Sequence, residues 1–134
     1  MGYGNSEIFL SAQEREDLIG SLMGKMVDAV IDRPIGHTHV TKGITLNYTV
    51  NYGFLPGMMG GDGEEQDVYV LGVDVPLETF RGCVIAAIRR RDDNEDKLVM
   101  APADMVFSAE EIREATWFVE KYFDSTIQVL GEDV

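Results

Sequence analysis

The sequence contains little cysteine, no long hydrophobic run and few basic residues. Its one cysteine, Cys83, excludes an internal disulfide, and the N-terminus lacks a secretory pattern, so a cytoplasmic protein is expected. No segment approaches the roughly 18 apolar residues that a membrane-spanning helix needs, so no membrane association is expected. The 11 Lys and Arg residues against 24 Asp and Glu give a net charge of −13, which argues against nucleic acid or anionic membranes as partners.

The remaining composition is that of an ordinary globular domain. The chain has 134 residues, of which 45% are hydrophobic, which suits a single domain over residues 1–134, with 1–10 irregular. The acidic excess has two explanations: it keeps the protein soluble, or some of the carboxylates gather to bind cations. Their positions along the chain decide between the two.

Two helices are predicted, one near each end of the chain. Each begins with a capping box, in which a serine stands three residues before a glutamate, and apolar residues then follow at helical spacing. The predicted helices span Ala12–Lys25 and about Ser108–Phe123.

The middle of the chain reads as short strands. Alternating or continuous apolar runs predict strands at Val27–Asp32, Ile44–Val50, Asp67–Val73, Cys83–Ile88 and Lys97–Ala101. A last segment, Ile127–Leu130, is either a strand or an extended tail. The segments predicted as loops are Ile35–Gly43, Phe54–Gly63 and a charged hairpin tip at Arg89–Asp96. Five or six strands between two helices favour a mainly β, α+β fold: a small twisted barrel or sheet with the helices packed outside.

The first acidic cluster comprises Asp62, Glu64 and Asp67, where a glycine-rich loop leads into an apolar strand. A carboxylate at the start of a buried strand is costly unless it is paired or binds a metal. Hard oxygen ligands of this kind suit Mg²⁺ or Mn²⁺. The alternative is a solvated acidic turn.

The second cluster, Asp92, Asp93, Glu95 and Asp96, lies at the predicted hairpin tip and is followed by Lys97. By itself it is typical of a polar hairpin. If both clusters meet at one mouth of a barrel, however, their carboxylates face one space and repel one another unless cations bind there.

These residues, taken in order, resemble the soluble inorganic pyrophosphatases of the single-domain barrel type. Tyr48, the run Asn51-Tyr52-Gly53-Phe54 and the run Asp62-Gly63-Glu64-Glu65-Gln66-Asp67 match that family's tyrosine, Asn-Tyr-Gly-Tyr and Asp-Gly-Asp-x-x-Asp motifs. The later Asp96-Lys97 resembles its Asp-x-Lys segment, without the intervening residue. Tyr122 resembles the tyrosine of its last helix, and Phe123 stands where the family has a phosphate-binding lysine.

The resemblance implies an oligonucleotide-binding-like (OB-like) barrel and metal-dependent hydrolysis of pyrophosphate to two phosphates. Mg²⁺ is the expected cofactor, with Mn²⁺ and Co²⁺ as alternatives, and a homo-oligomer is expected. The implied catalytic residues are Glu64 and Asp67. The implied metal ligands are Asp62, Asp67, Asp92 or Asp93, and Asp96. The implied phosphate contacts are Tyr48, Tyr52, Lys97 and Tyr122.

Four more residues are candidates for substrate binding. Arg33 and Lys42 are the cations near the predicted loop, and His37 and His39 are alternate residues within it that face one way if the segment is extended. The histidines contact phosphate, help to bind a metal, or are ordinary polar loop residues. Two other functions remain open: a pyrophosphatase-like domain without catalysis that binds a phosphorylated ligand or a protein, and a hydrolase for another small phosphate compound.

Overall fold

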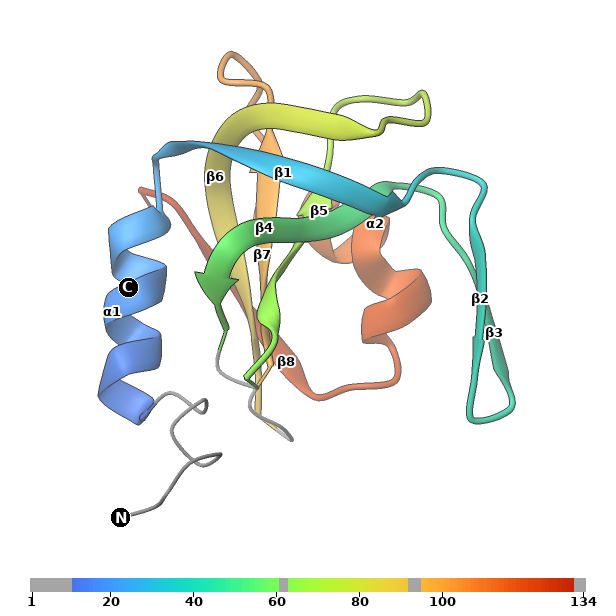
Figure 1. Ribbon diagram of the computed structural model, residues 1–134, viewed down its shortest axis with the longest axis horizontal. Coiled ribbons are helices and arrows are strands. Elements are labelled where there is room, and N and C mark those ends of the chain that lie inside the picture. The colour runs from blue at the N-terminus through green and yellow to red at the C-terminus, as the bar shows by residue number, and fades with distance from the viewer. Residues whose placement is uncertain (1–10, 61–62, 92–94, 132–134) are drawn as a thin grey trace.

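The computed structural model describes residues 11–60, 63–91 and 95–131. Within these residues the chain forms two α-helices and eight β-strands (Figure 1). In chain order they are α1 (Ala12–Leu22), β1 (Met26–Arg33), β2 (Thr38–Thr41), β3 (Ile44–Asn47), β4 (Asn51–Met59), β5 (Glu65–Val70), β6 (Thr79–Arg90), β7 (Asp96–Ala101), α2 (Ala109–Glu120) and β8 (Ser125–Val129).

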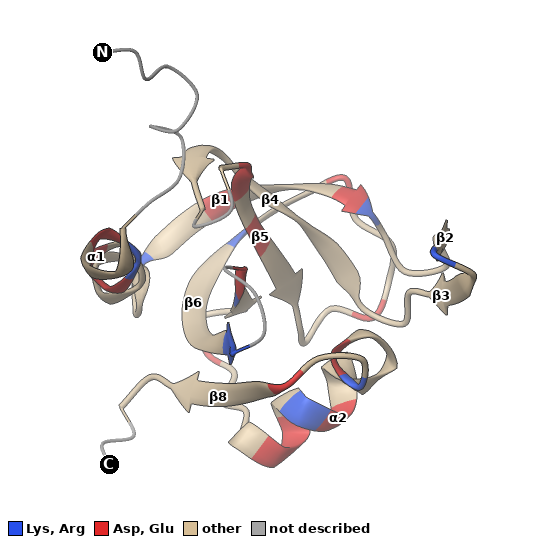
Figure 2. Cartoon of the chain, turned by 90° about the horizontal axis from the view of Figure 1, so that it is seen from below, with Lys and Arg blue, Asp and Glu red and all other residues tan. Residues whose placement is uncertain are grey.

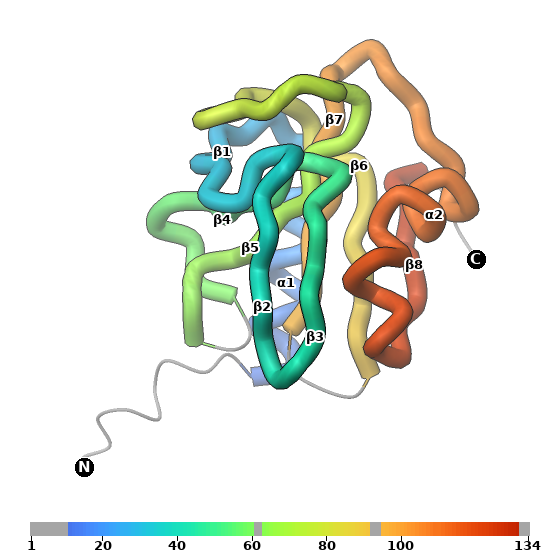
Figure 3. The backbone as a smooth tube through the Cα atoms, turned by 90° about the vertical axis from the view of Figure 1, so that its right-hand side faces the viewer, coloured from blue at the N-terminus to red at the C-terminus, as the bar shows by residue number. Residues whose placement is uncertain are grey.

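Five of the strands close into a barrel. Their order is β1-β4-β5-β7-β6, and β6 pairs again with β1. All of these pairs are antiparallel except β5 with β7. Strand β8 extends the sheet by pairing with β6, whereas β2 and β3 form a separate hairpin beside the barrel (Figure 3). The predicted class, a mainly β OB-like barrel with one N-terminal and one C-terminal helix, is confirmed.

The two helices cover opposite faces of the same strands. Side chains alternate along a strand, so Val68 of β5 faces one way and Tyr69 the other. One apolar cluster joins Val68 to Ile19 of α1, and a second joins Tyr69 to Ile112 of α2. Figure 1 accordingly shows α1 and α2 on opposite sides of the barrel.

Residues 54–63 were predicted as a loop, and this is wrong for the first part of the segment. Strand β4 runs through Phe54, which is paired with Val30 of β1 on one side and Asp67 of β5 on the other. The strands approach closely because Gly53 has no side chain: a Cβ there would lie 1.8 Å from the Val30 carbonyl oxygen. Pro56 is tolerated because it lies on the exposed part of β4, beyond these pairs.

The prediction of a plain loop over residues 35–43 is also wrong. Thr38–Thr41 form β2, which pairs with β3 from Thr38 opposite Asn47 to Thr41 opposite Ile44. A two-residue turn joins the strands, with Lys42 at φ 49° and Gly43 at φ 77°. Positive φ at both central positions defines the turn type that matches the twist of a hairpin. The dipeptide Lys42-Gly43 was not recognised in the sequence as such a turn.

The remaining boundaries shift by a few residues. Helix α1 ends at Leu22, before the predicted end at Lys25, because Gly24 adopts a left-handed conformation with φ 83°. Strands β6 and β7 extend into the predicted hairpin tip, to Arg90 and from Asp96. Within the described residues, neither helix is long and apolar enough to cross a membrane.

Candidate active site

A pocket of about 290 Å³ opens between the barrel, the β2–β3 hairpin and the end of α2. Its wall combines basic, acidic and aromatic side chains from segments far apart in the sequence. In Figure 2 basic segments lie on the hairpin and at the end of β6, which are both elements of this wall. The lining residues are Arg33, His39, Thr41, Lys42, Ile44, Leu46, Tyr48, Tyr52, Asp67, Arg90, Glu95, Lys97, Val119, Tyr122 and Phe123.

Lys97 is the buried cation of this pocket. Its ammonium group lies 2.6 Å from an Asp67 carboxylate oxygen and 3.6 Å from a Glu95 oxygen. Burial lowers the pKa of Lys97, but the neighbouring Tyr52, Asp67 and Glu95 outweigh this and raise the pKa above its usual value. Lys97 therefore carries a fixed positive charge at neutral pH, held between two carboxylates that come from β5 and from the segment before β7.

Three tyrosines extend from the pocket into the core. The ring centroids of Tyr48 and Tyr52 are 5.5 Å apart, and those of Tyr52 and Tyr69 are 4.9 Å apart. Arg33 donates a 2.6 Å hydrogen bond to the Tyr48 hydroxyl and lies over both the Tyr48 and Tyr52 rings. Burial raises the pKa of Tyr52, so that its hydroxyl keeps its proton at neutral pH and can donate it in a hydrogen bond.

Arg90 contributes a second buried cation. Its Nε and Nη2 donate to the two carboxylate oxygens of Glu120 at 3.1 and 2.8 Å, and its Nη1 donates to Glu95 at 3.0 Å. The guanidinium carbon lies 3.6 Å from the centroid of the Phe123 ring. The Tyr69 hydroxyl completes the network with a 2.7 Å hydrogen bond to Glu120.

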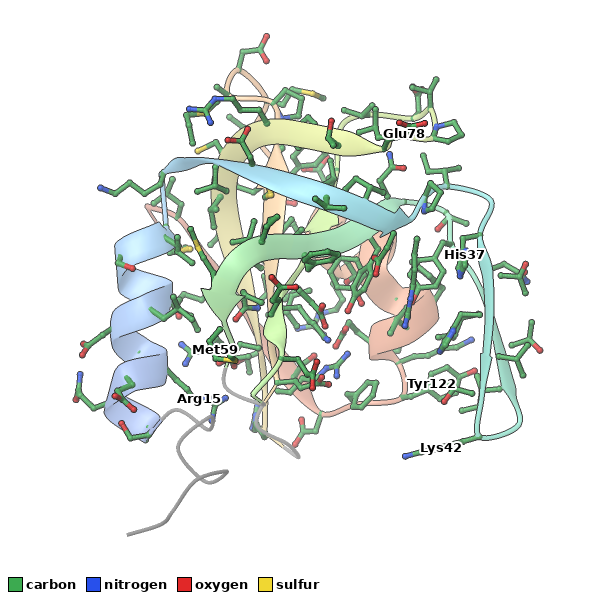
Figure 4. All side chains as sticks on the ribbon, in the orientation of Figure 1. Arg15, His37, Lys42, Met59, Glu78 and Tyr122 are labelled. Carbon is green, nitrogen blue, oxygen red and sulfur yellow. The ribbon has the colours of Figure 1, made fainter. Side chains whose placement is uncertain are left out.

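The structure brings most of the described candidate residues into this one pocket. They come from seven elements or their ends, and two of them, Lys42 at the hairpin tip and Tyr122 after α2, can be followed in Figure 4. The candidates on the pocket wall are Arg33, His39, Lys42, Tyr48, Tyr52, Asp67, Lys97 and Tyr122.

Three predicted site residues lie elsewhere. His37 contacts the Tyr48 ring edge-on, with 5.9 Å between the ring centroids, but does not line the pocket as His39 does. Glu64 is exposed in the turn before β5. Asp96 faces α1, where its carboxylate accepts hydrogen bonds from Arg15 and Arg89. Alternation along β7 turns the Asp96 side chain away from the Lys97 side, and its role as a metal ligand stays a prediction. Asp62, Asp92 and Asp93 lie outside the described residues.

Glu95 and Arg90 line the pocket, and buried Glu120 pairs with Arg90, but none of the three was predicted as a site residue. A usable signal for Glu95 was present: Glu95 and Lys97 are separated by one residue, so they share a strand face, whereas Asp96 and Lys97 cannot. The run Glu95-Asp96-Lys97 thus places an acidic residue two positions before the lysine. No comparable signal singles out Arg90 among three consecutive arginines.

The carboxylates of the pocket fit a hard divalent cation. Asp67 and Glu95 both approach Lys97 and so lie near one another on the wall. Mg²⁺ is usually held by one or two carboxylates, together with water and substrate phosphate, so two such groups form an adequate protein contribution. Among the described residues, no group of three Asp, Glu, His or Cys side chains is placed to enclose a metal by itself.

The fold and this pocket define a small OB-like barrel with cations and carboxylates gathered at one mouth. No family model matches the chain. It is 31% identical over 87 residues to the inorganic pyrophosphatase of Ralstonia nicotianae, in an alignment covering 58% of this chain and 48% of that protein. The chain thus matches about half the length of this curated relative.

Solved structures extend the likeness to the fold. The inorganic pyrophosphatase of Ehrlichia chaffeensis matches with a TM-score of 0.60 and 17% identity, over 81% of this chain and 88% of that one. That of Coxiella burnetii matches with a TM-score of 0.55 and 20% identity, over 83% and 88%. The resemblance predicted from the motifs is therefore confirmed: the chain has the fold of the soluble inorganic pyrophosphatases.

Proposed function

We propose that this protein hydrolyses inorganic pyrophosphate to two phosphates with the help of a divalent metal ion. The observation that carries the proposal is the meeting of Asp67, Glu95 and Lys97 in one pocket, with Arg33 and Arg90 on its walls. Carboxylates that can hold a cation thereby lie beside ammonium and guanidinium groups that can bind a polyanion. The sequence likeness to a curated pyrophosphatase supports this assignment.

The metal is assigned to the carboxylate side of the pocket. Asp67 and Glu95 would hold it, and Asp62 with Asp92 or Asp93, which neighbour the pocket in sequence, stay predicted as further ligands. A divalent cation there supplies positive charge that polarises a phosphoryl oxygen and acidifies a water molecule. Mg²⁺ is the expected ion, with Mn²⁺ and Co²⁺ as alternatives, because all the donors are oxygens.

The chain's own cations and hydroxyls bind the phosphates. Lys97 and Arg33 supply fixed positive charge, and Lys42 can reach the pocket from the hairpin tip (Figure 4). The hydroxyls of Tyr48 and Tyr122 can donate hydrogen bonds to phosphate oxygens, which orients the substrate and stabilises the charge that develops on the leaving phosphate. Glu64 stays a prediction as the group that accepts the proton of the attacking water. Self-association also stays a prediction.

The test is phosphate release from pyrophosphate in the presence of Mg²⁺, Mn²⁺ or Co²⁺. The Asp67→Asn variant removes one pocket carboxylate, and Asp28→Asn is its matched control because Asp28 is exposed on β1 and pairs with exposed Arg81. We expect metal-dependent release that Asp67→Asn lowers by at least ~100-fold and that Asp28→Asn leaves unchanged. The absence of release with every metal, or full activity in Asp67→Asn, would contradict the proposal.

A further inference from the structure

Arg90 occupies an unusual place for a charged residue. It lies at the end of β6, and its side chain is only 3% exposed although it borders the pocket. Removing a charged group from water is expensive, and a buried ion pair often adds little net stability compared with apolar packing. The arrangement is therefore poorly explained as a device for stabilising the fold, and a role at the pocket accounts for it better.

The guanidinium is fixed from several sides. Its fork meets both carboxylate oxygens of Glu120, a residue that is itself 2% exposed. Tyr69, fully buried, also donates to one of these oxygens, the one that accepts from Arg90 Nη2. One face of the guanidinium rests on the Phe123 ring. A planar group held in this way has one orientation, which an ammonium on a flexible stem would not have.

Glu95 accepts a hydrogen bond from the third guanidinium nitrogen, Nη1. Its side chain is 32% exposed, so the carboxylate spans the boundary between the buried network and the pocket. Its second oxygen faces Lys97 at 3.6 Å. Glu95 directly precedes β7. Its bond to the immobilised guanidinium makes Arg90 a rigid support for this carboxylate.

We infer that Arg90 is a positioning residue of the pocket, which holds the Glu95 carboxylate beside Lys97 and is itself held by Glu120 and Tyr69. The inference rests on the proposed function, since Glu95 is assigned there to metal binding. It also explains the run Arg89-Arg90-Arg91: alternation turns Arg90 toward the pocket, whereas Arg89 faces α1 and Arg91 pairs with exposed Asp124. Partners that orient a metal-holding side chain are commonly worth ~10- to 100-fold in metal affinity or activity.

The experiment removes the buried pair as a unit, because Arg90→Met alone leaves Glu120 with an unpaired buried charge and can prevent folding. The Arg90→Met/Glu120→Gln variant deletes both charges and keeps an acceptor for Tyr69. Glu95→Gln is then made in the wild-type chain and in this double variant. Arg91→Met is the matched control, an exposed arginine next in sequence. The readouts are Mn²⁺ affinity by calorimetry, kcat and KM for pyrophosphate, and stability in urea.

If Arg90 acts through Glu95, the two changes are not independent. We expect Glu95→Gln to weaken Mn²⁺ binding by ~10-fold in the wild-type chain but by less than ~3-fold in the Arg90→Met/Glu120→Gln variant. We expect kcat of the double variant to fall by ~10- to 100-fold with KM changed by less than ~3-fold, and the triple variant to be no slower. Tyr69→Phe, which loses one hydroxyl only, should show a smaller loss of kcat in the same direction.

Independent losses would overturn the inference. If Glu95→Gln has the same effect on Mn²⁺ affinity and on kcat in both backgrounds, Arg90 and Glu120 serve only the stability of the fold. A wild-type chain that neither binds Mn²⁺ nor releases phosphate would instead overturn the proposed function, and this inference with it. Normal wild-type activity with independent losses contradicts the positioning role alone, so the two failures are distinguishable.

Discussion

Asp96 and Lys97, two neighbouring residues at the start of β7, point their side chains to opposite faces of the strand. Asp96 turns toward α1, and its carboxylate, 4% exposed, is shared by Arg15 and Arg89. Lys97 turns toward α2 and meets Asp67 and Glu95 at the wall of the pocket. Both clusters contain buried, paired charges. In the part of the chain that the structure describes, the second cluster lines the pocket of about 290 Å³ and the first does not.

The comparison shows that pairing and burial do not identify a functional charge. The α1 cluster, defined as Arg15, Glu16, Arg89 and Asp96, fastens a helix to the barrel, because Arg89 bonds both Asp96 and Glu16. The pocket cluster joins β5, β6 and β7 and adds tyrosine hydroxyls. One residue of shift along a strand exchanges these roles, so the two clusters should respond differently to the same kind of substitution.

The largest expected effect is that of Lys97→Met. This substitution removes the buried cation, leaves Asp67 and Glu95 facing each other without it, and deprives the phosphates of a fixed charge. We expect kcat/KM for pyrophosphate to fall by ~100- to 1,000-fold, measured by phosphate release. Lys25→Met, at an exposed position before β1, is the control. Near-normal turnover in Lys97→Met would erase the distinction between the two sides of β7.

Asp96→Asn should produce the reverse pattern. The substitution leaves Arg15 and Arg89 without their shared carboxylate at a buried position, and we expect a loss of ~3 kcal/mol in the free energy of unfolding in urea. At temperatures where the variant is folded, kcat/KM should stay within ~2-fold of the wild-type value, because Asp96 does not line the pocket. A loss of turnover as large as that of Lys97→Met would support the prediction that Asp96 is a metal ligand.

Alkaline pH should lower the stability of the protein first through the buried tyrosines on the pocket side. Burial raises the pKa of Tyr52 and of Tyr69, and the nearby Glu120 raises that of Tyr69 further. Because unfolded tyrosine titrates near ~10, stability from these groups is fully present below that pH and is lost as pH rises toward the folded pKa, by up to ~1.4 kcal/mol per pH unit for each group.

The measurement is the free energy of unfolding in urea between pH 8 and pH 11, in the wild-type chain and in Tyr69→Phe. The variant should lose stability less steeply, since one buried hydroxyl no longer titrates. Identical slopes would show that Tyr69 does not carry this pH dependence. The α1 cluster contains no tyrosine and offers no such contribution.

His39→Asn should have the smallest effect. Burial and the nearby Arg33 and His37 lower the pKa of His39, so the imidazole is neutral at pH 7 and adds little attraction for phosphate. We expect KM for pyrophosphate to change by less than ~3-fold at pH 7.5, as determined from initial rates. A loss above tenfold would place His39 among the groups that bind the substrate directly.

Much of the fold could be predicted from the sequence because its signals are local. Both capping boxes form as predicted, at Ser11 with Glu14 and at Ser108 with Glu111. The apolar runs within β5, β6 and β7 were also predicted as strands. The predictions failed at β4 and at the β2–β3 hairpin, where glycine and proline suggested loops. There the pairing of distant strands outweighed local preference, and no window of the sequence contains that information.

The pocket residues also include some that local motifs predict and others that depend on tertiary packing. Asp67, Tyr48, Tyr52 and Lys97 were found through motifs and lie in the pocket. Asp96 was matched to the family motif in place of Glu95, although strand alternation indicates that Glu95 and not Asp96 shares a face with Lys97. Arg90 and Glu120 meet across β6 and α2, 30 residues apart, so their pairing is set by tertiary packing alone.

The Asn51–Phe54 motif contains residues that the fold requires beside a residue that faces the pocket. Asn51 ties together the backbones of Ile35, Val75 and Leu77, and Gly53 permits β1 and β4 to touch. Tyr52, between them, faces the pocket. Under the proposed function, a descendant of this chain that lost the activity would still need Asn51 and Gly53 in order to fold. In searches for distant relatives, those two residues therefore indicate a shared fold, whereas Asp67, Glu95 and Lys97 are the residues to check for the proposed activity.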